Sequence, residues 1–283
     1  MPPRKAPTAR QCRVGIELRK MRQHAGLALT EAATLLGTDR TAISNTESGR
    51  FGVSGERVRN WAGSYGCPDA AYVEALAAMA EERGKGWWEE YRGELTTEAL
   101  DLAELEHHAV AIRAVQLMYM PGFLQTEDYA RAVFDEAVPR MGSGHRRRLL
   151  SHRLKRRDVL DRDVPPTCTF LIHEAALRMV FGSSQVARAQ LDHLLRESER
   201  GNVAVKVVPF AAGGFPETGS ATQYVYGPVP QLDTVQMDTA TGSAFLDAET
   251  RLVNYRAALD RVEELSLGRE ESRDFIRKIT SEV

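Results

Sequence analysis

The 283-residue sequence has little cysteine and few aromatic residues, three cysteines and 7% aromatics. Cys12, Cys67 and Cys168 are far apart in the chain and form no CxxC pair. Because three thiols cannot all pair with one another, neither a disulfide framework nor a thiolate zinc site is expected.

Long apolar runs are also missing. No stretch approaches the ~18 continuous apolar residues that a membrane span requires. The basic N-terminus, MPPRKAPTARQCR, is not followed by the apolar run of a secretory signal. We therefore predict a cytoplasmic protein that does not bind membranes.

The common catalytic and nucleotide-binding motifs are absent from the sequence. It contains no GxSxG, HExxH, GxxxxGK[ST] or GxGxxG. The adjacent His107 and His108 would diverge by about 100° on a helix, which makes them a poor metal pair. We predict no enzymatic activity, no cofactor and no metal site.

Charge is distributed unevenly, although the net charge is only −2. Residues 1–60 contain 11 Lys/Arg and 5 Asp/Glu, whereas residues 61–110 contain 3 and 11; the remaining 173 residues hold 23 of each. A basic head on an otherwise acidic or neutral chain indicates a polyanionic partner for that head.

Hydrophobic periodicity and turn residues predict two kinds of architecture. Five short helices are expected in the head, at about 14–25, 30–36, 39–47, 55–65 and 69–83. Beyond a helical or extended segment at 111–120, helices are expected at about 127–137, 143–161, 183–200, 248–266 and 270–281, with strands at 167–173, 203–208, 221–226, 234–237 and 243–246.

The predicted fold is mainly α, a five-helix helix-turn-helix domain followed by an α+β domain with a small sheet. We divide the chain into a basic flexible arm (1–11), a DNA-binding domain (12–83), an acidic linker or helix (84–110) and an α+β domain (111–283). The last would serve sensing or partner binding and dimerisation.

The most informative segment is LALTEAATLLGTDRTAISNTESGR at 27–50. It predicts a helix, a tight turn at Gly37 and a second helix, which is the helix-turn-helix arrangement. Ile43 is the expected buried residue of the second helix, which leaves four polar side chains on one outward face, Arg40, Thr41, Ser44 and Asn45. Arg suits guanine, Asn suits adenine, and Ser and Thr suit phosphates or base edges. An all-α protein-binding module is the alternative, but the charge and the face chemistry favour DNA.

Residues 14–66 resemble the phage-repressor (XRE) type of helix-turn-helix domain, through VGIELRKMRQHAGL and LLGTDRTAISNTESGR. The resemblance implies that Arg40, Thr41 and Asn45 read bases, that Ser44 and Arg50 contact phosphates, and that Arg22 and Glu47 form a bracing ion pair.

The sequence departs from that family pattern at two places. Ala28 and Leu29 stand where the family usually has a capping Ser or Thr followed by Gln, so we expect Thr30 to cap the second helix and contact phosphate instead. Thr46 replaces the usual apolar residue beside Glu47, which should cost some core packing.

The similarity continues downstream through GWWEEY (86–91), the PGFLQTEDYAR stretch within 105–134, HEAALR (173–178) and VKVVPF (205–210). These segments resemble actinobacterial regulators called Scr-type antitoxin-like or WhiJ-like proteins. The resemblance implies a transcription regulator that is often encoded beside a small acidic partner protein.

Two features of the second part of the chain each have two interpretations. Trp87, Trp88, Glu174 and Phe215 are candidate pocket residues, although the two tryptophans more readily anchor a linker helix, and Glu174 suits a structural hydrogen bond equally well. The basic run at 145–157 is either a contact for phosphate or an acidic partner, or a solvated helix face, and the face is favoured.

The sequence as a whole predicts a nucleoid-associated homodimer that binds double-stranded DNA and regulates transcription. Its C-terminal domain would sense a small partner protein or a small-molecule ligand. The alternative is an antitoxin-like protein that sequesters its partner and binds DNA only for autoregulation.

Overall fold

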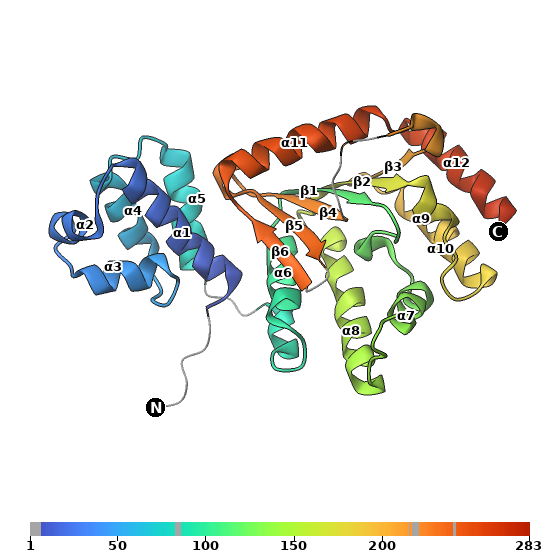
Figure 1. The fold of residues 1–283 in the computed structure, drawn as a ribbon, viewed down its shortest axis with the longest axis horizontal. Coiled ribbons are helices and arrows are strands. Elements are labelled where there is room, and N and C mark those ends of the chain that lie inside the picture. The colour runs from blue at the N-terminus through green and yellow to red at the C-terminus, as the bar shows by residue number, and fades with distance from the viewer. Residues whose placement is uncertain (1–6, 83–85, 215, 217–220, 240–241) are drawn as a thin grey trace. The chain divides into compact units, whose positions relative to one another are not determined.

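The computed structural model describes residues 7–82, 86–214, 216, 221–239 and 242–283. Residues 1–6 of the expected arm (1–11) and the candidate pocket residue Phe215 lie outside the described residues, whereas the end of the expected arm is helical, because the Thr8 side chain caps a helix that begins at Ala9. The chain divides into two compact units, Met1–Trp87 and Trp88–Val283, which are described separately below (Figure 1).

The first unit is entirely helical in its described part, which confirms the predicted five-helix head. Its helices are α1 (Ala9–His24), α2 (Leu29–Leu35), α3 (Arg40–Glu47), α4 (Gly55–Ser64) and α5 (Ala70–Glu81). Leu18, Ile43, Val58 and Leu76 are fully buried and come from four different helices. One small core therefore holds the unit together.

The start of α2 differs from the expectation. Thr30 does not cap the helix, because α2 begins one residue earlier, at Leu29. The Glu31 carboxylate accepts a hydrogen bond from the backbone N–H of Ala28 at 2.7 Å. This bond from the third helical residue is one half of a capping box, and the Ala28 side chain cannot supply the other half.

The second unit is built on a six-stranded sheet with the order β3-β2-β1-β4-β5-β6. The strands are β1 (Ala111–Gln116), β2 (Thr167–His173), β3 (Val203–Val208), β4 (Thr222–Tyr226), β5 (Thr234–Thr239) and β6 (Gly242–Leu246). β1, β2 and β3 pair in parallel, whereas the neighbouring pairs β1–β4, β4–β5 and β5–β6 are antiparallel. The predicted α+β class is confirmed.

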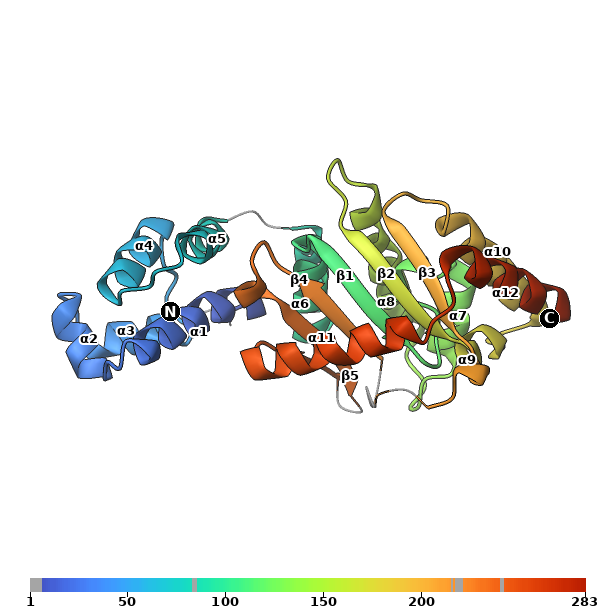
Figure 2. The same cartoon turned by 90° about the horizontal axis from the view of Figure 1, so that it is seen from above.

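Helices cover both faces of this sheet. They are α6 (Thr97–His107), α7 (Glu127–Asp135), α8 (Ser143–Arg156), α9 (Glu174–Arg178), α10 (Ser184–Glu197), α11 (Glu249–Glu264) and α12 (Arg269–Glu282), with short 3₁₀ turns at 87–91, 122–124, 157–161, 210–212 and 230–232. α11 lies across one face, and α6, α7, α8 and α10 lie on the other (Figures 1 and 2).

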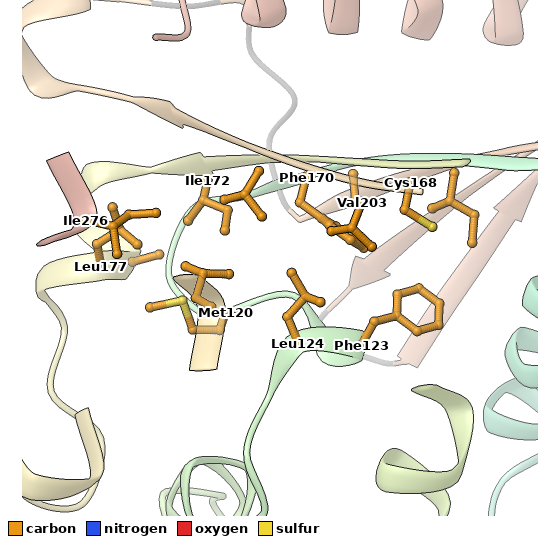
Figure 3. Packing of buried hydrophobic residues seen from close by; sticks show 14 of the residues in the cluster. Met120, Phe123, Leu124, Cys168, Phe170, Ile172, Leu177, Val203 and Ile276 are labelled. Carbon is orange, nitrogen blue, oxygen red and sulfur yellow. The ribbon is translucent and has the colours of Figure 1, made fainter. Parts of the chain in front are cut away.

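Each face of the sheet has its own apolar core. Under α11, Leu252, Leu259 and Val262 pack against Tyr224 and Val235 of the strands. The larger core, on the opposite face, joins strand residues such as Phe170 and Ile172 to the 120–124 segment and to Ile276 of α12 (Figure 3). The alternating strand side chains thus point into two separate layers.

Two segments that the sequence left open are now defined. The first six residues of the 111–120 segment form β1, which lies in the interior of the sheet between β2 and β4. The acidic stretch before it contains α6, whose first turn is capped by the Thr96 hydroxyl. Among the described residues, no helix has the length and apolar character needed to cross a membrane.

Candidate DNA interface

A tight turn at Gly37 connects α2 and α3. Gly37 has a φ of +60°, a left-handed conformation that side-chain-bearing residues rarely adopt. Two residues later, the Asp39 carboxylate accepts a hydrogen bond from the N–H of Ala42 at 2.8 Å and caps α3. The turn and the cap fix where α3 begins.

The inner face of α3 is packed closely into the unit. Ile43 is fully buried, as is Ala32 of α2, whose small side chain leaves room for α3. On α1, Gly15 lies so near the end of α3 that a Cβ atom there would stand 2.5 Å from the carbonyl oxygen of Thr46. The buried Thr46 hydroxyl donates a hydrogen bond to the Ala42 carbonyl oxygen at 2.9 Å, so this polar group has a partner where the two helices meet.

A buried ion pair joins α1 to the end of α3. Arg22 Nε donates to Glu47 Oε1 at 2.6 Å and Arg22 Nη2 donates to Glu47 Oε2 at 2.9 Å, while Nη1 donates to the carbonyl oxygen of Leu27 at 2.7 Å. Only 8% and 6% of the two side chains are exposed. The hydrogen bonds to Glu47 raise the pKa of Arg22, so the guanidinium stays charged and α3 is braced from within.

The outer face of α3 carries the predicted base-reading side chains. Arg40, Thr41 and Ser44 are exposed and Asn45 is half-buried. Within the described residues none of these four side chains makes a hydrogen bond or an ion pair. Their donors and acceptors are consequently available to a ligand.

The two other expected phosphate-contacting residues flank α3 in the chain. Thr30 lies in the first turn of α2 and Arg50 follows the turn at Gly49, and both are exposed. Gly49 packs on the start of α1, where an added Cβ would lie 2.9 Å from the Cα of Cys12. The backbone that carries Arg50 is thus anchored to the domain.

Two of the candidate pocket residues, Trp88 and Glu174, have structural partners in the second unit. Trp88 is buried and packs against the rings of His107 and His108, at 5.1 and 6.2 Å between centroids. Glu174 instead accepts the backbone N–H of Phe210 at 2.8 Å and pairs with Arg178. Within the described residues, no group of three or more His, Cys, Asp and Glu side chains is arranged to hold a metal ion.

The basic run at 145–157 is largely used inside the second unit. Arg148 pairs with Glu94, Lys155 with Glu90, and Arg146 with Asp135. Arg156 makes a two-bond ion pair with Glu106, whose side chain is 2% exposed. Four members of this run are therefore paired with acidic residues up to 65 residues away in the chain, which no local sequence pattern could indicate.

The fold of the first unit, with α3 presented on its surface, is that of a helix-turn-helix domain. Comparison with known families agrees: a helix-turn-helix domain matches residues 13–79, and a domain of unknown function (DUF5753) matches residues 99–278. The protein is thus a DNA-binding regulator of the helix-turn-helix class. Because the second match covers more than half of the sequence, the chain belongs to the DUF5753 family. No curated protein and no solved structure matches it.

Proposed function

We propose that this protein is a sequence-specific transcription regulator that inserts α3 into the major groove of DNA. Arg40, Thr41 and Asn45 read base edges there. The observation that carries the proposal is an unbonded polar face on α3, backed by the buried Ile43 and Glu47. A guanidinium and an amide on one exposed helix face match the acceptor and donor patterns of guanine and adenine.

Phosphate contacts position the domain along the duplex. Thr30, Ser44 and Arg50 are exposed and belong to α2, α3 and the turn that follows α3. Contacts of this kind fix the register of the protein on DNA but carry no sequence information directly.

The regulator acts as a homodimer on two half-sites. One head of this size contacts only a few base pairs, and such a contact is weak at physiological salt. The second unit supplies dimerisation and responds to a small partner protein or a small-molecule ligand.

One surface of the second unit favours a protein partner. Met118, Tyr119, Val180 and Phe210 are 44–55% exposed, and all four follow the carboxyl ends of the parallel strands β1, β2 and β3. Exposed apolar groups gathered at one end of a sheet are typical of an interaction surface. In the antitoxin-like alternative this surface sequesters the partner, and DNA affinity does not change when the partner binds.

The proposal is tested by fluorescence-anisotropy titration of the full chain with its own upstream DNA, at two salt concentrations, against scrambled DNA. We expect specific binding that weakens as salt increases. Equal affinity for both DNAs would contradict sequence-specific regulation. Where a small acidic protein is encoded beside the gene, adding it then separates the two roles, because only a sensor changes its DNA affinity.

Two substitutions test the assignment of residues. Arg40→Ala should cost about 1–3 kcal/mol at one base-pair position and relax the preference there. Arg50→Ala should weaken binding to all sequences alike and reduce the salt dependence. If Arg40→Ala leaves both affinity and preference unchanged, the reading face has been assigned wrongly.

A further inference from the structure

Two arginines of α8 lie one helical turn apart on the side of the second unit that contains the larger core. Arg156 is fully compensated: its Nε and Nη2 donate to the two oxygens of Glu106 at 2.7 and 2.5 Å. Glu106 Oε1 also accepts from Gln223 at 2.9 Å. The carboxylate of Glu106 is thus committed to Arg156 and Gln223.

Arg153 has no such carboxylate. Within the described residues it makes one hydrogen bond, from Nη1 to Gln125 Oε1 at 2.8 Å, and no ion pair. Arg22 and Arg156 both present the edge formed by Nε and Nη2 to a carboxylate. In Arg153 the same edge carries no hydrogen bond to any described residue.

The guanidinium of Arg153 is nevertheless held in a defined position. Gln125 is 2% exposed, and its Nε2 donates to the carbonyl oxygen of Met120 at 2.8 Å, which turns Oε1 toward Arg153. On another side, the guanidinium carbon lies 5.2 Å from the ring centroid of Phe134, within cation–π range. A fixed guanidinium with a free two-donor edge is suited to recognise a planar oxyanion.

The electrostatic surroundings also favour an added negative charge. Burial and the positive charge of Arg156 lower the pKa of Arg153 to about 10, against the opposing effect of Asp238 and Glu106. Arg153 remains protonated at neutral pH, so the site holds a half-buried cation that contacts no acidic group among the described residues.

Space for a ligand lies nearby. Phe134, which contacts Arg153, also lines a cavity of about 300 Å³ together with Asp135, Arg140, Met141 and Arg146. Arg146 precedes Arg153 by seven residues, so both lie on the same side of α8. Arg153 itself does not line the cavity; Phe134 is the residue that contacts both.

We propose that Arg153 is the anion-recognition residue of a small-molecule site in the second unit. Its Nε and Nη2 donate to a carboxylate or a phosphate group, while Gln125 and Phe134 keep the guanidinium in place. This deepens the sensing role proposed above by naming the ligand class. Its test measures anion binding and not DNA binding, so each proposal can fail without the other.

The experiment uses the full chain with inorganic phosphate and, separately, succinate, each compared with chloride at equal ionic strength. Thermal unfolding and isothermal titration calorimetry are the readouts. We expect a saturable rise in the unfolding temperature with at least one of the two anions. A response to phosphate alone identifies a phosphate-type ligand, and a response to succinate alone a carboxylate-type ligand.

Three variants make the result specific to Arg153. Arg153→Gln should reduce the response to that of chloride. Arg153→Lys keeps the charge and the apolar stem but loses the two-donor edge, so we expect binding at least about tenfold weaker. Arg147→Gln removes the same charge from an exposed position of α8 and should respond as the wild type does.

Two results would overturn the proposal. One is a wild-type protein that shows no saturable response to either anion. The other is a response of Arg153→Lys equal to that of the wild type, which would mean that a positive charge alone, without the two-donor edge, is enough to bind the anion. Circular dichroism of each variant verifies that the fold is retained.

Discussion

Identical residue types have opposite roles in this protein, and their surroundings decide which. Arg22 is buried and donates hydrogen bonds to Glu47 and the Leu27 carbonyl, whereas Arg40 is exposed and makes no hydrogen bond to any described residue. The helix-turn-helix pattern let the sequence anticipate both positions. Nothing local could indicate that Arg156 pairs with Glu106, because 50 residues separate them and the contact exists only after the sheet has formed.

The Arg22–Glu47 pair gives a sharp stability prediction. Glu47→Ala leaves the guanidinium of Arg22 buried without its counter-charge, which should lower the free energy of unfolding by about 3–5 kcal/mol. Glu56→Ala, at an exposed position of α4, is the control and should change it by less than about 0.5 kcal/mol. Urea unfolding followed by circular dichroism measures both, and similar losses in the two variants would show that the pair does not brace the domain.

The buried His152 predicts a dependence of stability on pH. Burial, together with the positive charges of Arg156 and Arg153, lowers the pKa of His152 to about 3, below the ordinary value of 6.5. Between these two values the unfolded chain binds a proton that the folded chain does not, so stability falls as pH decreases through this window and is fully present above 6.5.

The test compares the wild type with His152→Gln at pH 7 and pH 5. Between these two pH values, the wild type should lose about 2 kcal/mol more unfolding free energy than the variant, from the conversion of 1.36 kcal/mol per pKa unit. The variant is the control for carboxylates and other histidines that titrate in the same range. Parallel pH profiles would contradict the assignment of this effect to His152.

At the scale of elements, periodicity and capping residues were enough to predict the helices, but not how the strands pair. The head helices and most helices of the second unit follow from apolar spacing and from N-caps such as Asp39 and Ser183. The start of α2 was predicted wrongly because the helix begins after Ala28, which has no capping side chain and whose backbone N–H donates to Glu31. Strand order could not be predicted, since β1 joins strands far along the chain on both sides and no local signal encodes that choice.

The contact between α1 and α3 makes a prediction at this scale. Gly15→Ala introduces a Cβ atom 2.5 Å from a backbone oxygen of α3, so the helices must move apart. We expect a loss of about 1–3 kcal/mol in stability, typical of overpacking, with weaker DNA binding because α3 shifts.

Gly63→Ala is the matched control. Gly63 is also helical and in the same unit, but an added Cβ has nothing within 4 Å. That variant should be stabilised by up to about 1 kcal/mol, since alanine favours helix and restricts the unfolded chain. Thermal unfolding compares the two, and equal effects would exclude a tight α1–α3 contact.

Across the whole molecule, the structure explains how the charges are used. In the second unit, the acidic segment before β1 supplies Glu90, Glu94 and Glu106, which pair with the basic run of α8. In the first unit, Arg19, Arg40 and Arg50 form no ion pair within the described residues. These exposed cations of the head are therefore available to a polyanion, whereas four members of the basic run of α8 are paired within the second unit.

A single head with few unpaired cations makes dimerisation the decisive property of the whole molecule. Sedimentation equilibrium should give twice the chain mass of 31.4 kDa. DNA with two half-sites should bind at least about 100-fold more tightly than DNA with one, because the second head binds at a high effective concentration once the first is bound. Scrambling one half-site at constant length is the control. If the protein sediments as a single chain and binds both DNAs equally, each head recognises its site alone, and the second unit has another role than bringing two heads together.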